Sequence, residues 1–374
     1  MNSVCYQINL QPTFGGGEVY TRFFTETLAE LGMRSVLLVA RGAGYWRDLL
    51  PSAEIHEIAD EAELVAALPK VASFVVTHTT LTPELAERIA ARNRLAGFAH
   101  MPLYERDPGG LAHYHRVFAV SRHVMASALA RGLANVHSEP LYAVADIAPR
   151  RLVRGPLRAA SVYSWDRRKV RDRLAGFLEP FIEPFMARPQ YRRRPGITLG
   201  IVSRLTPIKQ FPLLFQATEA VLAPLSGINI DIFGSGGYAS VRDLRRAVAP
   251  LGERVRFWGD QADVSQVFRQ LDYVMSGLPE KEALGLNLIE AQYCGTPVLA
   301  VDAPPFDETV AHGQTGYLYQ DPRHDGGADF GRLLQAIQAG LQRPAPLQAT
   351  GHLAHFSRDA FRDRVSRAIA GATR

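Results

Sequence analysis

The sequence predicts an α/β protein built from two doubly wound parallel sheets. The chain has 374 residues, enough for two domains of about 150 residues each. Short apolar runs alternate with longer segments of helical period, and this alternation occurs twice, on either side of a stretch rich in Pro and Arg. Because the short runs show little polar alternation, they are typical of parallel strands that are covered on both faces.

Strands are expected where the apolar runs are bounded by polar or glycine-containing segments. In the first half they cover residues 4–10, 35–40, 74–77, 95–99 and 117–121, and in the second half 197–203, 228–233, 255–258, 273–276 and 298–301. The first connecting helix is expected over residues 18–31, where apolar side chains recur on one face and Gly32 supplies the stop. A final helix is expected over residues 355–370.

These elements divide the chain into two sheet domains, residues 1–151 and 197–350. Residues 152–196 form a basic connector or insertion, and residues 351–374 are expected to cross back to the first domain. Four prolines at 180, 184, 189 and 195 exclude one long helix in the connector. Residues 165–177 have the period of a short amphipathic helix, which fits either a membrane-surface or acceptor-binding element or a helix docked on its own domain.

Composition excludes several classes of protein. With 47% hydrophobic and 21% charged residues, the chain is neither disordered nor fibrous. Cys5 and Cys294 form no disulfide framework and lie in no metal-type spacing. No secretory signal or membrane-spanning run is recognised, so the expected location is the cytoplasm. The net charge is +5, and basic clusters occur at residues 150–151, 167–169 and 192–194. Such clusters either bind an anionic membrane surface or simply form part of a solvent-exposed protein surface. No nucleic-acid-binding module accompanies them.

Glycine-rich turns follow two of the expected strands. Gly16 and Gly17 lie where a strand passes into a helix, a place where bare amides and the helix dipole suit an anion. Gly234 and Gly236 follow the strand over 228–233 and are expected to expose backbone amides in the same way. In both places a plain turn without a ligand also explains the glycines.

Charged residues follow two other strands at the edge where open parallel sheets bind ligands. Arg204 and Lys209 come after the strand over 197–203, and together they suit a diphosphate or are a pair of surface cations. Glu282 lies in a later loop and Glu290 in the helix that follows Gly285, where two carboxylates can each accept from sugar hydroxyls. The amides that would point at a bound phosphate are those of Ala283, Leu284, Gly285 and Leu286. The alternative is a solvent-facing Glu282 and a Glu290 that pairs on the helix surface.

Two histidines end strands in the first domain. His78 follows the strand over 74–77 and His100 follows the strand over 95–99. Histidine donates or exchanges a proton near neutral pH, although a lone histidine is more often structural. Their equivalent positions favour a site role for at least one of them.

The order of these motifs resembles that of the retaining glycosyltransferases of family 4, which belong to glycosyltransferase group 1. The resemblance is strongest over about residues 197–320 and looser over the first 150 residues. It implies the GT-B fold, in which two Rossmann-like domains face each other across a cleft. Two departures are Leu284, where the family usually has Phe, and Pro304-Pro305-Phe306, which replaces a glycine-rich turn.

The resemblance also implies a role for each motif. Glu290 should hold the ribose hydroxyls of the donor, and Glu282 should contact the donor sugar. Arg204 and Lys209 should neutralise the departing diphosphate without a metal ion. His100 should face the reacting sugar, and Gly16 and Gly17 should approach the phosphate or the acceptor.

The function that follows is a retaining glycosyltransferase without a cofactor. It would move a sugar from a UDP- or GDP-linked donor to a hydroxyl of a glycan or lipid-linked glycan, in the assembly of cell-surface polysaccharide or lipopolysaccharide. Its place would be the cytoplasm or the inner face of the cell membrane. The alternative is a nucleotide-sugar epimerase or another donor-processing enzyme on the same fold, which needs no acceptor.

Overall fold

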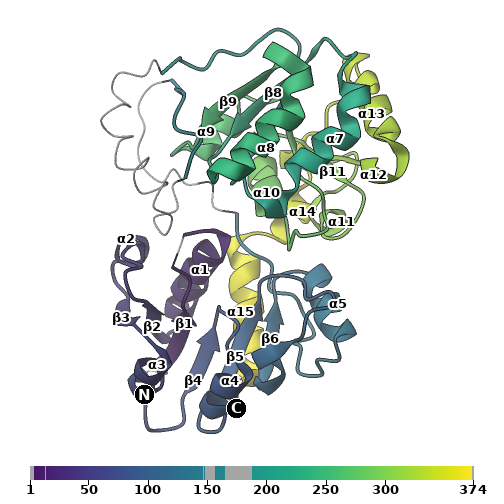
Figure 1. Cartoon of the computed structure of the whole chain (residues 1–374). Helices are drawn as coiled ribbons and strands as arrows, with labels where there is room; N and C mark the ends of the chain where they lie inside the picture. Colours follow the sequence, from purple (N-terminus) through teal and green to yellow (C-terminus); the bar gives the residue numbers. More distant parts are fainter. Residues whose placement is uncertain (1–3, 13, 146, 148–155, 165–187, 373–374) are drawn as a thin grey trace. The chain divides into compact units, whose positions relative to one another are not determined.

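Two parallel six-stranded sheets organise the chain, one in each of two compact units (Figure 1). Unit 1 comprises residues 1–144 and 354–374, and unit 2 comprises residues 145–353. The computed structural model describes all residues except 1–3, 13, 146, 148–155, 165–187 and 373–374. The helix expected over 165–177 therefore lies outside the described residues.

The sheet of unit 1 has the strand order β3-β2-β1-β4-β5-β6, with every pairing parallel. Its strands are β1 (Val4–Asn9), β2 (Arg34–Ala40), β3 (Glu54–Ile58), β4 (Phe74–Thr77), β5 (Arg94–Ala99) and β6 (Arg116–Ala119). Because β1, β4 and β5 are neighbours at its centre, the loops that follow these three strands leave the sheet side by side.

Helices connect the strands of unit 1. They are α1 (Gly16–Glu30), α2 (Tyr45–Leu49), α3 (Glu61–Ala67), α4 (Pro83–Ala90), α5 (Arg122–Ala130) and the terminal α15 (Arg358–Ala372), with a 3-10 turn at Gly109–His113. The last helix, α15, packs against α1: the Phe361 and Tyr20 rings meet edge to face with centroids 5.5 Å apart. At the rim of this contact, Arg358 pairs with Glu30.

The sheet of unit 2 has the strand order β12-β11-β10-β7-β8-β9, again with parallel pairings throughout. Its strands are β7 (Ile197–Val202), β8 (Ile228–Phe233), β9 (Val255–Gly259), β10 (Tyr273–Met275), β11 (Val298–Val301) and β12 (Gly316–Tyr319). The central strands β7, β8, β10 and β11 are buried almost throughout, as expected for strands with helices on both faces.

The helices of unit 2 include two that begin at the edge where the site is expected, α7 and α10. The full set is α7 (Phe211–Leu222), α8 (Tyr238–Val248), α9 (Val264–Phe268), α10 (Leu286–Tyr293), α11 (Phe306–Thr309), α12 (Pro322–Asp325), α13 (Ala328–Gln338) and α14 (Thr350–Ala354), with 3-10 turns at Pro207–Lys209, Ala249–Arg254 and Pro346–Gln348. Along the described parts of the chain, no helix is both long enough and apolar enough to span a bilayer.

Two strands were not predicted from the sequence, β3 and β12, and both lie at sheet edges. In β3, the sequence EIHEI alternates between exposed or half-buried positions and ends at the buried Ile58. An edge strand has one open side, so it carries polar side chains that an apolar-run criterion rejects. The prediction missed β12 as well, a four-residue strand of the sequence GYLY that begins with glycine.

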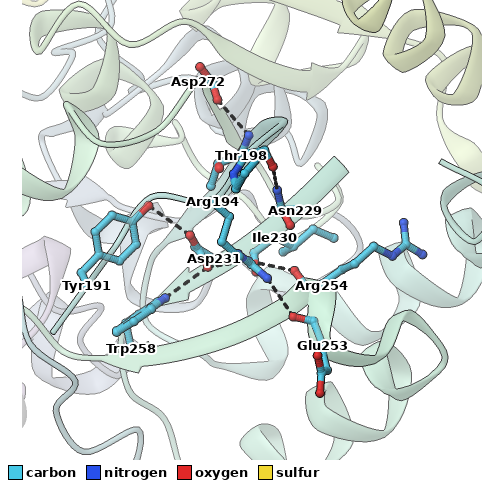
Figure 2. A network of polar contacts seen from close by, with 11 residues as sticks. Tyr191, Arg194, Thr198, Asn229, Ile230, Asp231, Glu253, Arg254, Trp258 and Asp272 are labelled. Atoms are coloured by element: carbon cyan, nitrogen blue, oxygen red, sulfur yellow. Dashed lines mark hydrogen bonds and ion pairs between the residues drawn. The ribbon is translucent and has the colours of Figure 1, made fainter. Parts of the chain in front are cut away.

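A buried carboxylate fastens the end of the connector to the sheet of unit 2 (Figure 2). Asp231, in the middle of β8, is 1% exposed. It accepts hydrogen bonds from the Tyr191 hydroxyl at 3.1 Å, the Arg194 guanidinium at 2.9 Å and the Trp258 indole at 3.2 Å. Arg194 also donates to the carbonyls of Glu253 and Arg254. The segment that leads into β7 is therefore tied to both β8 and β9.

Candidate functional site

The candidate site of unit 2 is formed by the loops that follow two adjacent strands, β7 and β10. The loop after β7 carries Arg204 and Lys209, and the loop after β10 carries Glu282 and leads into α10. Since β7 and β10 are paired and parallel, both loops leave the same edge of the sheet.

Glycines allow the loop after β7 to lie directly on its neighbours. A Cβ built on Gly277 would come within 1.8 Å of the Lys209 carbonyl oxygen. A Cβ on Gly234 would come within 1.9 Å of the Ser203 carbonyl, and one on Gly236 within 2.1 Å of the Leu205 carbonyl. Any side chain at these three positions would push the loop, and Lys209 with it, away from the sheet.

Lys209 and Glu282 meet directly across the two loops. The Lys209 ammonium donates to Glu282 Oε2, and the backbone amides of Ala283 and Gly285 both donate to Glu282 Oε1 at 3.2 Å. The side chains of Lys209 and Glu282 are 21% and 15% exposed. Burial opposes ionisation of Glu282, but the ammonium and the two amides outweigh it and hold the pKa of this carboxyl below its ordinary value. The Glu282 carboxylate is therefore ionised at neutral pH.

Gly285 sets the start of α10. It has φ +79°, a left-handed conformation that favours glycine, and α10 begins at the next residue. A Cβ on Gly285 would lie 3.0 Å from the Phe306 ring, so the Pro304-Pro305-Phe306 turn supports this loop with an aromatic side chain. Leu284 is 4% exposed, so its side chain lies in the interior. The amides of Ala283 to Leu286 thus lie at the positive end of the α10 dipole.

The other two charged residues predicted for this site lie on the same elements. Arg204 is exposed, on the loop that ends at Lys209. Glu290 is half-buried on α10, one turn beyond Leu286. The structure thus brings Lys209, Glu282, Ala283 and Gly285 into direct contact and places Arg204 and Glu290 on the adjoining loop and helix.

The expectation that Gly234 and Gly236 expose free amides is wrong. The Gly234 amide donates to the Gly259 carbonyl at 2.7 Å, and the Gly236 amide donates to the Val162 carbonyl at 3.0 Å. Ser164 donates in turn to the Gly236 carbonyl, so Gly236 pairs with the connector as if in a short strand. These glycines provide room for the loop after β7 rather than donors for a ligand.

Gln210, which follows Lys209, was not predicted as a site residue, because no motif in the sequence marks it. It is 7% exposed and has φ +53°, an unusual conformation for a residue with a side chain. Its amide Nε2 lies 3.4 Å from Glu280 Oε2, which also accepts from Arg323 at 2.9 Å. Gln210 and Arg323 therefore join the loop after β7, the loop after β10 and α12.

The Arg cluster at 192–194 does not form a free basic surface. Arg193 pairs with Asp272, and Arg194 is bound to the buried Asp231. Two of its three charges are therefore compensated inside unit 2. The clusters at 150–151 and 167–169 lie outside the described residues.

Unit 1 carries its predicted site residues at one edge of its own sheet. Gly16 and Gly17 open α1 after β1, His78 follows β4, and His100 follows β5. A Cβ on Gly16 or Gly17 would meet none of the described atoms within 4 Å, so chain packing does not require glycine there. Tyr20 of α1 lies edge to face with the His100 ring, at a centroid distance of 5.1 Å.

The rings of His78 and His100 stack on each other, with centroids 5.8 Å apart. His78 contacts Gln7 Oε1 through Nε2 at 3.0 Å. Within the described part of unit 1, His100 Nε2 is buried and has no hydrogen-bond partner. Burial lowers the pKa of His100 to about 4, and burial together with the charge of His100 lowers the pKa of His78. Both rings are therefore neutral at pH 7.

Among the described residues, no three His, Cys, Asp or Glu side chains are arranged so that they could hold a metal ion. Cys5 and Cys294 are both free thiols. Burial raises the pKa of Cys294 to about 11, so it is not a reactive thiolate at neutral pH.

Known proteins resemble the part of the chain that carries the unit 2 site. Residues 188–329, which contain both of its loops, match the family model described as glycosyl transferases group 1. This part of the chain is similar to the group 1 glycosyl transferases. The recognised resemblance is thereby confirmed.

Curated relatives match part of the chain. The D-inositol 3-phosphate glycosyltransferase of Mycobacteroides abscessus is 34% identical over 181 residues, and that of Rhodococcus erythropolis is 31% identical over 185 residues. Each alignment takes in 46% of this chain but 40% of the relative. The chain thus spans less than half the length of the curated relatives it matches.

Solved glycosyltransferase structures share the fold along almost the whole chain. Anabaena HepE, solved with UDP and glucose, has a TM-score of 0.69 at 16% identity, covering 99% of this chain and 100% of HepE. The lipopolysaccharide outer core galactosyltransferase WaaB, in its apo form, has a TM-score of 0.67 at 16% identity, covering 99% of both chains. These similarities confirm the predicted GT-B fold class, with a Rossmann-like sheet in each unit.

Proposed function

We propose that the chain is a retaining glycosyltransferase and that unit 2 binds its donor, a sugar linked to a nucleoside diphosphate. One observation carries the proposal: the Lys209 ammonium and the amides of Ala283 and Gly285 converge on a single anionic group at the start of α10. An ammonium and helix-terminal amides are the groups that hold a diphosphate in the absence of a metal ion. They lie within the part of the chain that matches the glycosyl transferase family.

The proposed chemistry follows from where charge develops. When the bond between the sugar and the diphosphate breaks, negative charge collects on the leaving phosphate. Fixed cations and amides that meet this charge lower the barrier, because they need no reorganisation at that moment. We assign this role to Lys209, Arg204 and the amides of residues 283–286, without a metal ion.

The remaining roles concern hydroxyl groups. Glu290, half-buried on α10, would accept from the ribose hydroxyls, and Glu282 would accept from hydroxyls of the donor sugar. In unit 1, the neutral His100 would face the reacting sugar, and Gly16 and Gly17 would approach the phosphate or the acceptor. A neutral histidine donates or accepts a hydrogen bond there without adding charge.

The donor class is proposed as UDP- or GDP-linked sugar, and UDP is favoured because HepE was solved with UDP and glucose. The acceptor is proposed to be a hydroxyl of a glycan or lipid-linked glycan, at the inner face of the cell membrane. The names of the curated relatives add D-inositol 3-phosphate to the acceptors worth testing.

The test is release of nucleoside diphosphate from a panel of UDP- and GDP-sugars, with and without acceptors. We expect Lys209→Ala to lower kcat/KM by about 100- to 1000-fold, the usual effect of removing one group that stabilises a leaving anion. The matched control is Lys281→Ala, because Lys281 is an exposed lysine beside Glu282. Equal rates for the two variants would refute the assignment. An isomerised donor with no transfer product would establish an epimerase instead, and NMR of the product's anomeric proton tests retention.

A further inference from the structure

Glu282 takes up the same donors that the proposed function assigns to the diphosphate of the donor. Its Oε2 accepts from Lys209, and its Oε1 accepts from the amides of Ala283 and Gly285. We propose that Glu282 is a displaceable counter-ion: it competes with the nucleoside diphosphate for Lys209 and the loop amides, and thereby weakens binding of the product. This inference rests on the proposed function of the unit 2 site.

Competition follows because the donors are shared. A lysine ammonium has three protons, but a backbone amide has one and cannot hold two anions with full strength. The side chain of Glu282 is 15% exposed, so little water screens the repulsion between its carboxylate and a second anion. A bound phosphate and the present position of Glu282 therefore exclude each other.

The exchange requires movement of one side chain and not of the loop. Glu280, two residues earlier, is held by Arg323 at 2.9 Å and lies 3.4 Å from Gln210 Nε2. Gly277, earlier in the loop, lies against the Lys209 carbonyl. With the loop held at these points, Glu282 can turn about its own side-chain bonds toward the sugar hydroxyls and return to Lys209 when the sugar has left.

The counter-ion acts more strongly against product than against substrate. A nucleotide sugar carries two negative charges on its diphosphate. A free nucleoside diphosphate carries nearly three at neutral pH, because a terminal phosphate has a second pKa of about 6. Repulsion from the Glu282 carboxylate grows with the charge of the ligand. Glu282 therefore favours release of the diphosphate after transfer, in addition to its contact with the sugar.

Isothermal titration with UDP and GDP tests the inference. We expect Glu282→Gln to bind the preferred diphosphate at least tenfold more tightly than the wild-type chain, although it transfers sugar more slowly. Asp243→Asn is the matched control, because it removes an exposed carboxylate of unit 2 that pairs with Arg242 rather than with Lys209; its affinity should stay within twofold of the wild type. Glu282→Ala serves as a second variant, with the same expected direction, if Glu282→Gln does not fold.

Unchanged or weaker binding of the diphosphate by the Glu282 variants would overturn the inference. Lys209→Ala separates this failure from failure of the proposed function. If Lys209→Ala loses binding while the Glu282 variants gain none, the diphosphate site stands and only the counter-ion role is refuted. If Lys209→Ala binds UDP and GDP like the wild type, the assignment of the site itself is refuted and the inference falls with it.

Discussion

Replacement of Asp231 by alanine would remove the buried anion that holds the end of the connector to the sheet of unit 2 (Figure 2). Asp231 is 1% exposed and the side chain of Arg194 is 14% exposed, so the guanidinium would be left buried without its counter-charge. Removal of one partner of a buried ion pair lowers the free energy of unfolding by about 3–5 kcal/mol. Because Arg194 keeps its hydrogen bonds to the carbonyls of Glu253 and Arg254, we expect Asp231→Ala to lower it by about 3 kcal/mol, the lower end of this range.

The assay is hydrogen exchange of the intact chain, read by mass spectrometry on separate peptides. If the free energy of unfolding falls in unit 2 alone, amide exchange should become faster in β8 and β9. Peptides of β1 in unit 1 serve as an internal reference. Asp243→Ala is the matched control, because Asp243 forms an exposed pair with Arg242 and should cost less than about 0.5 kcal/mol. If Asp231→Ala lowers the free energy of unfolding by less than about 1 kcal/mol, or by no more than the control does, the buried Asp231–Arg194 pair does not stabilise unit 2 as proposed.

Two further predictions concern the sites. Gly277→Ala should weaken binding of UDP or GDP at least tenfold in titration, because its Cβ would lie 1.8 Å from the Lys209 carbonyl oxygen. Gly237→Ala is the control and should bind like the wild type, because its Cβ would meet nothing within 4 Å. Equal affinities of the two variants would contradict the prediction. His100 has a pKa of about 4 when folded and an ordinary value of 6.5, so the unfolded chain takes up the proton first as pH falls. The free energy of unfolding should therefore drop by up to about 3 kcal/mol between pH 6.5 and 4. In urea unfolding, the free energy of unfolding of His100→Asn should fall less than that of the wild type over this pH range. The same pH dependence in both chains would show that His100 is not its source.

The central strands and the starts of the site loops follow from the sequence, because strands buried on both faces are continuous apolar runs. The expected runs at 74–77, 228–233 and 298–301 coincide with β4, β8 and β11. Gly285 marks the start of α10 because its φ of +79° favours glycine. The edge strand β3 fails the same criterion because its sequence EIHEI carries three polar side chains, whereas β6 and β9, which also lie at sheet edges, were predicted from their apolar residues.

Side-chain partners could not be predicted in the same way. Lys209 and Glu282 are 73 residues apart, and the sequence assigned them to different parts of the ligand, whereas the structure pairs them. The amide of Gly236 donates to the connector, a backbone pairing that leaves no residue pattern. Asp231 lies within an apolar run, and its partners Tyr191 and Trp258 come from segments on either side of β8. The local sequence pattern predicts where helices and strands begin and end. The contacts among distant side chains depend on how the strands are ordered in the sheet.

Lys209 and the start of α10 are proposed to hold the diphosphate of the donor. A crystal structure of the chain with UDP or GDP bound tests this proposal directly. We expect the terminal phosphate within hydrogen-bond distance of Lys209 Nζ and of the Gly285 amide, with the Glu282 carboxylate turned away from Lys209. Phosphates bound elsewhere, with the Lys209–Glu282 pair intact, would contradict it.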